Sequence, residues 1–266
     1  MKVEPGWELP EYSEDVYRER RTRYATIIPV LNEGERIRTQ LQRMREFSTM
    51  ADVIIVDGGS TDGALAPEFL RDHEVRTLIH KLGSGRLSAQ LRLGLAYALA
   101  EGYEGVILID GNNKDNPAAI PDFIRMLDAG YDHVQGSRFR PGGKAIHNPA
   151  MRLWGIRLVH APLISLAAGV RYTDTTNGFR GYSRRLLADP RVRPLRHIFS
   201  AYELHYYLAI RAARVGLKVI EIPVEREYPA EGPMPSKIKG VRGNAKIMRT
   251  LIDACLHRFD PGQPRR

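Results

Sequence analysis

Cysteine is almost absent from this chain of 266 residues, which contains only Cys255. One cysteine excludes an intramolecular disulfide and any zinc site built from several cysteines, and it is consistent with a reducing compartment. No uncharged apolar run reaches the roughly 18 residues that span a bilayer. The nearest, residues 153–170, is interrupted by Arg157, His160 and Pro162.

Several sequence signals are also missing. Residues 1–23 carry many charges and no apolar segment, so no signal peptide is expected. No Gly-x-Gly-x-x-Gly follows the first expected strand, and no Gly-x-x-x-x-Gly-Lys-Ser/Thr occurs. These two absences disfavour a dinucleotide-binding Rossmann site and a P-loop NTPase.

Positive charge is what the chain has in excess. Its net charge is +9, its pI is about 9.7, and 43% of its residues are hydrophobic. That apolar content is typical of a globular protein. The charge suggests an anionic partner, which is a nucleic acid, a phosphorylated substrate or an anionic membrane. No helix-turn-helix, RRM or zinc-finger pattern supports nucleic acid.

Short apolar runs alternate with helical patterns along the first 140 residues. We expect strands over residues 24–30, 51–56, 75–80, 104–109 and 131–135, and helices over 33–47, 87–100 and 118–128. This alternation predicts an α/β fold with a mostly parallel, doubly wound sheet. Residues 1–23 are expected to form an extended or partly helical charged arm. After Gly143 the chain becomes more helical and more basic, which indicates a second lobe packed on the same sheet.

Polar clusters follow three of the expected strands: Asn32 with Glu33, residues 57–62 and residues 110–115. Open α/β sheets bind ligands at the carboxyl ends of their strands, so these clusters are expected at one binding edge. Asp110 and Asn112 are spaced i, i+2 on a turn, where oxygen ligands can share Mg²⁺ or Mn²⁺. The alternative is that polar residues simply form turns.

These clusters resemble the signatures of a known family. Residues 28–33 (Ile-Pro-Val-Leu-Asn-Glu), 55–63 (Ile-Val-Asp-Gly-Gly-Ser-Thr-Asp-Gly) and 108–112 (Leu-Ile-Asp-Gly-Asn) resemble family 2 glycosyltransferases with the GT-A fold. Later motifs resemble the dolichol-phosphate mannose synthase and polyprenyl-phosphate glycosyltransferase branch. They are residues 134–139, 141–143, 174–180 and 221–224, Glu203, Ser236 and Lys237.

The resemblance implies a GT-A domain over residues 24–240, with a Rossmann-like, mostly parallel sheet, flanking helices and a C-terminal helical acceptor-side region. Residues 24–143 would form the nucleotide-sugar half and residues 144–240 the acceptor half, followed by an amphipathic helix and tail over 241–266. The implied activity is inverting hexosyl transfer from a nucleotide-sugar, with a dolichyl- or undecaprenyl-type polyprenyl phosphate as first choice of acceptor. A sugar hydroxyl in polysaccharide or glycolipid synthesis is the alternative acceptor, and non-catalytic binding of an anionic partner is the alternative function.

The resemblance also implies roles for residues of the first half. Asp110 and Asn112 would hold a divalent cation, Mg²⁺ or Mn²⁺, that stabilises the leaving diphosphate. The implied nucleotide-sugar-binding residues are Pro29, Asn32, Glu33, Asp57, Arg86, Asp110, Gly111 and Lys114. Three positions depart from the family pattern. Asn112 replaces the second aspartate, Gly58 replaces another aspartate, and Lys114 stands where glutamine is common. A lysine there would repel a cation or partly replace it.

The acceptor determines which residues the second half needs. A sugar hydroxyl needs a general base, and the candidate catalytic carboxylates are Asp174 and Glu203, besides Asp110. A lipid phosphate is already anionic and needs cations instead. The candidate acceptor-binding residues are Arg138, Arg180, Arg226, Ser236 and Lys237. The alternatives are a surface helix position for Glu203 and a solvated charge for Arg226.

Two basic amphipathic stretches, residues 151–168 and 241–259, bear on membrane contact. Such helices either lie in a membrane interface or pack their apolar stripe on the core. Core packing is favoured for the second, and both options stay open for the first. The expected location is cytoplasmic, with peripheral contact at the inner face of the membrane.

Overall fold

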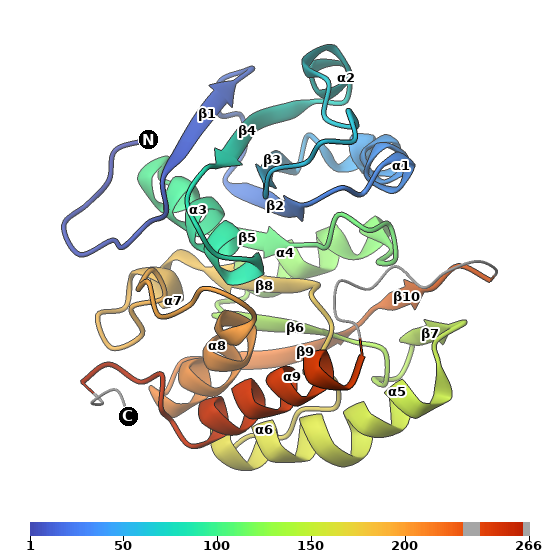
Figure 1. The fold of residues 1–266 in the computed structure, drawn as a ribbon, viewed down its shortest axis with the longest axis vertical. Helices are drawn as coiled ribbons and strands as arrows, with labels where there is room; N and C mark the ends of the chain where they lie inside the picture. Colours follow the sequence, from blue (N-terminus) through green and yellow to red (C-terminus); the bar gives the residue numbers. More distant parts are fainter. Residues whose placement is uncertain (231–239, 263–266) are drawn as a thin grey trace.

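The computed structural model describes residues 1–230 and 240–262, and these are organised around one mixed β-sheet (Figure 1). The eight strands of this sheet run in the order β1-β4-β3-β2-β5-β8-β6-β9. They are β1 (Tyr12–Val16), β2 (Tyr24–Val30), β3 (Ala51–Asp57), β4 (Val75–Lys81), β5 (Gly105–Leu108), β6 (His133–Ser137), β8 (Arg180–Ser183) and β9 (Val219–Pro223). A separate parallel pair is formed by β7 (Lys144–Ile146) and β10 (Glu225–Glu227).

Helices connect the strands and cover both faces of the sheet. The α-helices are α1 (Glu35–Met44), α2 (Pro67–Asp72), α3 (Leu87–Ala100), α4 (Ile120–Asp128), α5 (Ala150–Gly155), α6 (Ala161–Ala168), α7 (Arg184–Ala188), α8 (Glu203–Arg214) and α9 (Gly240–Cys255). Two 3₁₀ turns, η1 (Arg45–Phe47) and η2 (Pro117–Ala119), and a π-helical segment, η3 (Ile156–His160), complete the described elements.

The sheet is mostly parallel, as predicted. β2 pairs in parallel with both β3 and β5, β3 with β4, and β6 with β9. Two strands run the other way. β1 is antiparallel to β4, and β8 is antiparallel to both β5 and β6. The expected extended arm therefore contains an edge strand of the sheet, and the fifth expected strand begins two residues later, at His133.

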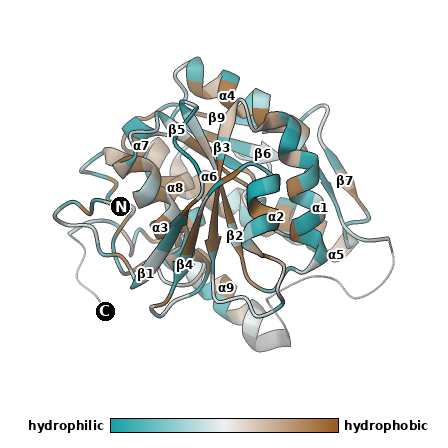
Figure 2. Cartoon of the chain, turned by 90° about the horizontal axis from the view of Figure 1, so that it is seen from above, coloured by the Kyte–Doolittle hydropathy of each residue, from teal (hydrophilic) through white to brown (hydrophobic). Residues whose placement is uncertain are grey.

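Apolar side chains account for the layers. All seven residues of β3 are buried, as expected for a strand covered on both faces. α3 is buried almost all round, because the sheet lies on one side and α7 and α8 on the other. α1, α2 and α4 cover the opposite face, so Figure 2 shows hydrophobic strands between helices of mixed hydropathy.

A third apolar cluster joins α6, α8 and α9. Leu251 and Ala254 of α9 are buried there, which confirms core packing for the second amphipathic stretch. Figure 1 shows α5, α6 and α9 together at the end of the molecule opposite β1. Within the described ranges, no helix is long and apolar enough to cross a bilayer.

Candidate active site

The first two polar loops are tied together at the carboxyl edge of the sheet. The backbone N–H of Asn32 donates to Oγ of Ser60 over 2.9 Å, and Oδ1 of Asn32 accepts from the backbone N–H of Thr61 over 2.7 Å. Asp57 accepts from both the backbone and the hydroxyl of Ser60. The loop after β2 and the loop after β3 thus form one polar surface. Glu33 in this surface pairs with Arg36.

Gln90, which was not predicted, supports these loops from beneath. This buried residue of α3 donates from Nε2 to the carbonyls of Val30 and Val56, both over 2.8 Å. Its amide also explains Gly58. A Cβ at Gly58 would lie 3.0 Å from that same Nε2, so the aspartate that is usual in the family pattern would push the Gln90 amide aside. A buried glutamine on a helix bordering the polar loops was the available signal.

The third polar loop, residues 110–115, packs against β2 and α1. Gly111 lies against Pro29 and Val30 of β2. The backbone N–H of Asn113 donates to the buried Oε1 of Gln40 in α1 over 2.8 Å. All three polar clusters predicted from the sequence therefore meet at one edge of the sheet. Arg86, an exposed residue preceding α3, donates its backbone N–H to the carbonyl of Ser200.

Arg226 is the residue that the structure brings to the centre of this edge. Its Nη2 lies 3.0 Å from Oδ2 of Asp110, and its Nη1 donates to Oδ2 of Asp115. The side chain of Arg226 is 7% exposed, that of Asp115 is fully buried and that of Asp110 is 24% exposed. Burial raises the pKa of Asp110, but the surrounding positive charges, that of Arg226 first, together with the hydrogen bond from Arg226 leave that pKa below its usual value.

Two further cationic side chains, Lys114 and Arg152, lie near Arg226 and contact Tyr228. Nζ of Lys114 lies 4.4 Å from the centre of the Tyr228 ring, and Nη1 of Arg152 donates to the hydroxyl of Tyr228 over 2.6 Å. Burial and, secondarily, the charge of Arg226 lower the pKa of Lys114 to about 8. We call Asp110, Lys114, Asp115, Arg152 and Arg226 the charged cluster.

His205 also borders the charged cluster and was not predicted. It lies in the first turn of α8, within electrostatic reach of Asp110. Burial, followed by the charge of Arg180, lowers the pKa of His205 to about 3, so its ring is neutral at physiological pH. No sequence motif marked this histidine, because its approach to Asp110 depends on how α8 packs against the sheet.

Asp174 and Arg138, two of the residues predicted for the acceptor side, form a buried pair. Oδ2 of Asp174 accepts from Nε of Arg138 over 2.7 Å, and Oδ1 accepts from Nη2 over 2.9 Å. Neither side chain is more than 2% exposed. Burial raises the pKa of Asp174, and the guanidinium more than offsets this and leaves the pKa below its ordinary value. A carboxylate held this way accepts a proton poorly.

The remaining acceptor-side candidates lie apart from the charged cluster or outside the described residues. Arg180 is buried and donates to the backbone carbonyls of Thr175, Asn177 and His205. The carboxylate of Glu203 accepts from the backbone N–H of Ala201 over 2.7 Å at the start of α8. Ser236 and Lys237 fall within residues 231–239, outside the described part of the chain.

Comparisons with known proteins agree with this geometry. The family model "Glycosyl transferase family 2" matches residues 25–189. The chain belongs to glycosyltransferase family 2. The undecaprenyl-phosphate mannosyltransferase of Micrococcus luteus is 32% identical over 82% of this chain and 90% of its own length. The polyprenol monophosphomannose synthase of Mycolicibacterium smegmatis is 28% identical over 86% of this chain and 91% of its own.

Solved structures confirm the GT-A fold of this family 2 glycosyltransferase. Glucosyl-3-phosphoglycerate synthase from Mycobacterium tuberculosis, bound to Mn²⁺, UDP-glucose and phosphoglyceric acid, has a TM-score of 0.64 and 19% identity. It is matched over 91% of this chain and 80% of its own. The same enzyme in complex with Mg²⁺ and UDP has a TM-score of 0.59, at 18% identity and the same coverage. Both complexes of that enzyme contain a divalent cation, together with UDP-glucose in the first and UDP in the second.

The charged cluster of this family 2 glycosyltransferase fits such a cation poorly. Within the described residues, no group of three His, Cys, Asp or Glu side chains is placed to hold a metal. The predicted pair offers one carboxylate, Asp110, and one neutral amide, Asn112, whose Nδ2 points to Oδ2 of Asp110 over 3.5 Å. Arg226 already pairs with that carboxylate oxygen. A dication here meets few anionic ligands and several cations.

Gly178 fixes the position of Asp110 and provides a direct test of the site. A Cβ at Gly178 would lie 2.5 Å from Oδ1 of Asp110, too close for any real contact. We expect Gly178→Ala to displace this carboxylate and reduce glycosyl transfer by about 100-fold, the size of effect seen when one positioned group is lost. The reduction should appear in kcat, with little change in the melting temperature. Gly155→Ala, where a Cβ meets nothing within 4 Å, is the matched control. Equal turnover of both variants would argue against this site.

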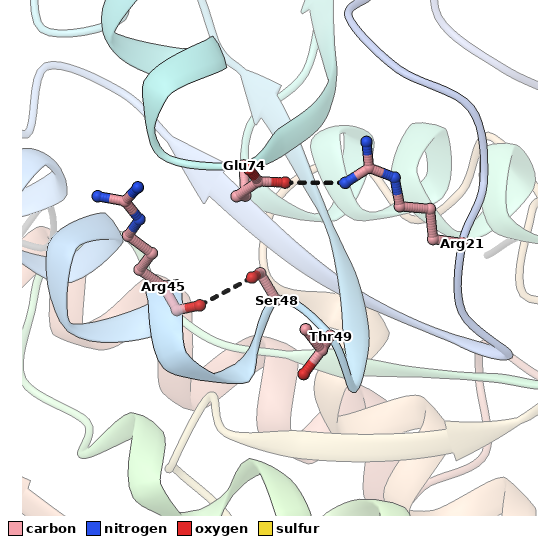
Figure 3. Close-up of a pocket in the computed structure, with 5 residues that line it drawn as sticks. All are labelled: Arg21, Arg45, Ser48, Thr49 and Glu74. Atoms are coloured by element: carbon pink, nitrogen blue, oxygen red, sulfur yellow. Dashed lines mark hydrogen bonds and ion pairs between the residues drawn. The ribbon is translucent and has the colours of Figure 1, made fainter.

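A hollow of about 400 Å³ lies away from the charged cluster (Figure 3). Its lining residues are Arg21, Arg45, Ser48, Thr49 and Glu74. Arg21 pairs with Glu74 over 3.1 Å, and the hydroxyl of Ser48 donates to the carbonyl of Arg45. These residues precede β2 and β3 or follow α2, so the hollow faces the amino ends of the strands, opposite to the polar loops.

Proposed function

We propose that this enzyme transfers a hexosyl group, with inversion, from a nucleotide-sugar to a polyprenyl phosphate. A phosphate oxygen of the acceptor attacks the anomeric carbon, the bond from that carbon to the donor diphosphate breaks, and a nucleoside diphosphate leaves. The observation that carries the proposal is the cation-rich charged cluster beside the exposed apolar helix α5. The names of the M. luteus and M. smegmatis relatives, both acting on polyprenyl phosphates, support the choice of acceptor.

The linked polar loops suit the donor. In this proposal Pro29, Asn32, Glu33 and Asp57 contact the base and ribose, and Gly111 lets the diphosphate approach the backbone. Asp110 lies nearest the reacting sugar because it is the partly exposed carboxylate of the charged cluster. The leaving diphosphate gains negative charge, and positioned cations stabilise it. Arg226 and Lys114 are cations already in place for this.

The acceptor side suits an anion better than a hydroxyl. A phosphate is already a nucleophile and needs no strong base. Asp174, one candidate base, has both oxygens engaged by Arg138. Arg152 is exposed and reaches Tyr228, so we add it to Ser236 and Lys237 as an acceptor-phosphate contact. Arg138 and Arg180 instead hold residues 174–177 in place, Arg138 through Asp174 and Arg180 through backbone carbonyls. This arrangement favours phosphate over the alternative hydroxyl acceptor.

A transfer assay distinguishes the acceptors. Undecaprenyl phosphate, undecaprenol and a soluble oligosaccharide are each incubated with labelled nucleotide-sugars of several bases, with Mg²⁺ and Mn²⁺ present. The expected result is lipid-linked label with undecaprenyl phosphate alone. Undecaprenol is the matched control, because it has the same chain without the phosphate. Label on the oligosaccharide would point to the hydroxyl alternative, and label on no acceptor would remove support for transferase activity.

We further propose that α5, η3 and α6 contact the membrane that holds such an acceptor. Met151, Trp154, Leu158 and Leu166 are between 57% and 83% exposed along this stretch. Arg152 and Arg157 are exposed among them, and basic amphipathic helices bind anionic interfaces. Arg152 also joins the charged cluster, so a membrane on this face would present its lipid phosphates beside the site.

Leu158→Glu tests this contact. Losing one buried leucine from the interface removes about 2 kcal/mol of transfer free energy, so vesicle binding should fall by about tenfold or more. Co-sedimentation with phosphatidylcholine–phosphatidylglycerol vesicles measures it. Val16→Glu is the control, because Val16 is 53% exposed on β1, at the opposite end of the molecule (Figure 1). Equal sedimentation of both variants would exclude this face.

A further inference from the structure

Arg226 is built into the charged cluster more firmly than a surface cation. It follows β9 on the short strand β10, and an isolated backbone bridge pairs it with Asp115. The fully buried carboxylate of Asp115 then holds one side of the guanidinium, while the partly exposed Asp110 holds the other. The backbone N–H of Glu227 donates to the carbonyl of Lys114 over 2.7 Å, which fixes β10 against the loop after β5.

The charge balance of the cluster is positive without any bound ion. Arg226, Lys114 and Arg152 carry three positive charges, and Asp110 and Asp115 carry two negative ones, which leaves one positive charge. Tyr228 contacts both Lys114 and Arg152 and keeps them near the site. Nζ of Lys114 lies 4.4 Å from the centre of its ring, and Cζ of Arg152 lies 5.7 Å from it. A guanidinium offers five N–H donors in a planar fork that matches phosphate oxygens.

The charged cluster offers few favourable ligands to a divalent cation. Asp110 is the one carboxylate of the predicted metal pair, and its Oδ2 already accepts from Arg226. Asn112 is neutral, and Lys114 adds a positive charge two residues further on. A diphosphate, by contrast, brings the negative charge that this cluster lacks. The features that weaken a metal site are the same ones that favour a directly bound anion.

We propose that Arg226, assisted by Lys114, binds the donor diphosphate directly and takes the place of the divalent cation. Asp115 and Asp110 orient the guanidinium, and the diphosphate oxygens contact it. This inference rests on the proposed function, because it concerns the donor of that reaction. It extends the function by making donor binding independent of Mg²⁺ and Mn²⁺.

Nucleotide binding tests this without any need for turnover. Calorimetric titration of the full chain with UDP, GDP, CDP, dTDP and ADP is carried out in EDTA and again in Mn²⁺. We expect one of these nucleotides to bind, with dissociation constants in EDTA and in Mn²⁺ that agree within about threefold. Arg226→Gln should weaken that binding in EDTA by at least tenfold, with Arg226→Lys intermediate. Arg125→Gln, at an exposed position of α4, makes the same charge change away from the site.

The double variant Asn112→Asp with Lys114→Gln provides the opposite test. It restores a second carboxylate and removes a cation, so Mn²⁺ should now tighten nucleotide binding by at least tenfold. The double variant also keeps the test open if Arg226→Gln fails to fold.

The outcomes separate this inference from the proposed function. Binding by the unmodified protein only with Mn²⁺ or Mg²⁺ would overturn the inference and leave the function standing. Binding in EDTA that Arg226→Gln does not weaken would overturn the role of Arg226. An Mn²⁺ response of the double variant no larger than that of the unmodified protein would also count against direct cation replacement. Binding of no nucleotide in either condition would overturn the proposed function and, with it, this inference.

Discussion

Asp110→Ala is expected to lower glycosyl transfer at least 1,000-fold, the upper range for loss of one preorganised catalytic group. Asp110 is the partly exposed carboxylate at the carboxyl end of β5. Its Oδ2 accepts a hydrogen bond from Nη2 of Arg226 over 3.0 Å and so orients the guanidinium. The fold should survive, because Arg226 keeps its buried partner Asp115 and no charge is left unpaired. Steady-state kcat from labelled transfer measures the effect, and the melting temperature reports the fold.

Asp122→Asn is the matched control for Asp110, because Asp122 is an exposed carboxylate on α4 that pairs with Arg125. It should leave both turnover and melting temperature unchanged. Near-normal turnover by a folded Asp110→Ala variant would remove Asp110 from the catalytic site. A large drop in melting temperature would instead indicate that the Asp110–Arg226 pair is needed for folding.

Asp174→Ala should act mainly on stability. It leaves the guanidinium of Arg138 buried without its carboxylate, and breaking a buried pair in this way costs about 3–5 kcal/mol. This is a large fraction of the usual 5–15 kcal/mol free energy of unfolding. Urea unfolding at neutral pH measures the loss. The double variant Arg138→Met with Asp174→Leu should recover much of it, because no unpaired charge remains.

Acid sensitivity gives a second view of the same pair. The pKa of Asp174 is lower in the folded protein than in the unfolded chain, where it is about 3.9. The stabilisation is therefore fully present at neutral pH and is lost as the pH falls below about 4 through the folded-state pKa. Asp174→Ala should flatten this part of the stability curve. If Asp174→Ala abolished turnover at unchanged stability, a catalytic role would replace the structural one.

Local sequence patterns predicted much of the secondary structure of residues 24–143. Buried apolar runs marked β2, β3 and β4 within a residue of their observed ends, and the periodic run over residues 87–100 matches α3. These elements form where burial and periodicity agree. The polar loops were also predicted together, because parallel strands bring their carboxyl ends to one edge.

Contacts between distant segments were not readable from those patterns. Arg226 was predicted among the acceptor-binding residues, and its pairing with Asp110 and Asp115 depends on where β10 lies after more than 100 intervening residues. Similarly, β1 pairs with β4 although its sequence has no strong apolar alternation. Side-chain charge alone cannot specify such partners. The roles assigned to the individual site residues stay predictions.

The position of β8 has a consequence for synthesis on the ribosome. This strand lies between β5 and β6, so in the described part of the chain β6 and β9 join the sheet through residues 180–183. Until these residues emerge, β5 is an open edge, and open edges invite pairing with other chains. Residues 24–143, the predicted nucleotide-sugar half, therefore cannot complete the sheet during their own translation. We expect a chain ending at residue 143 to aggregate, while one extended through β8 closes that edge.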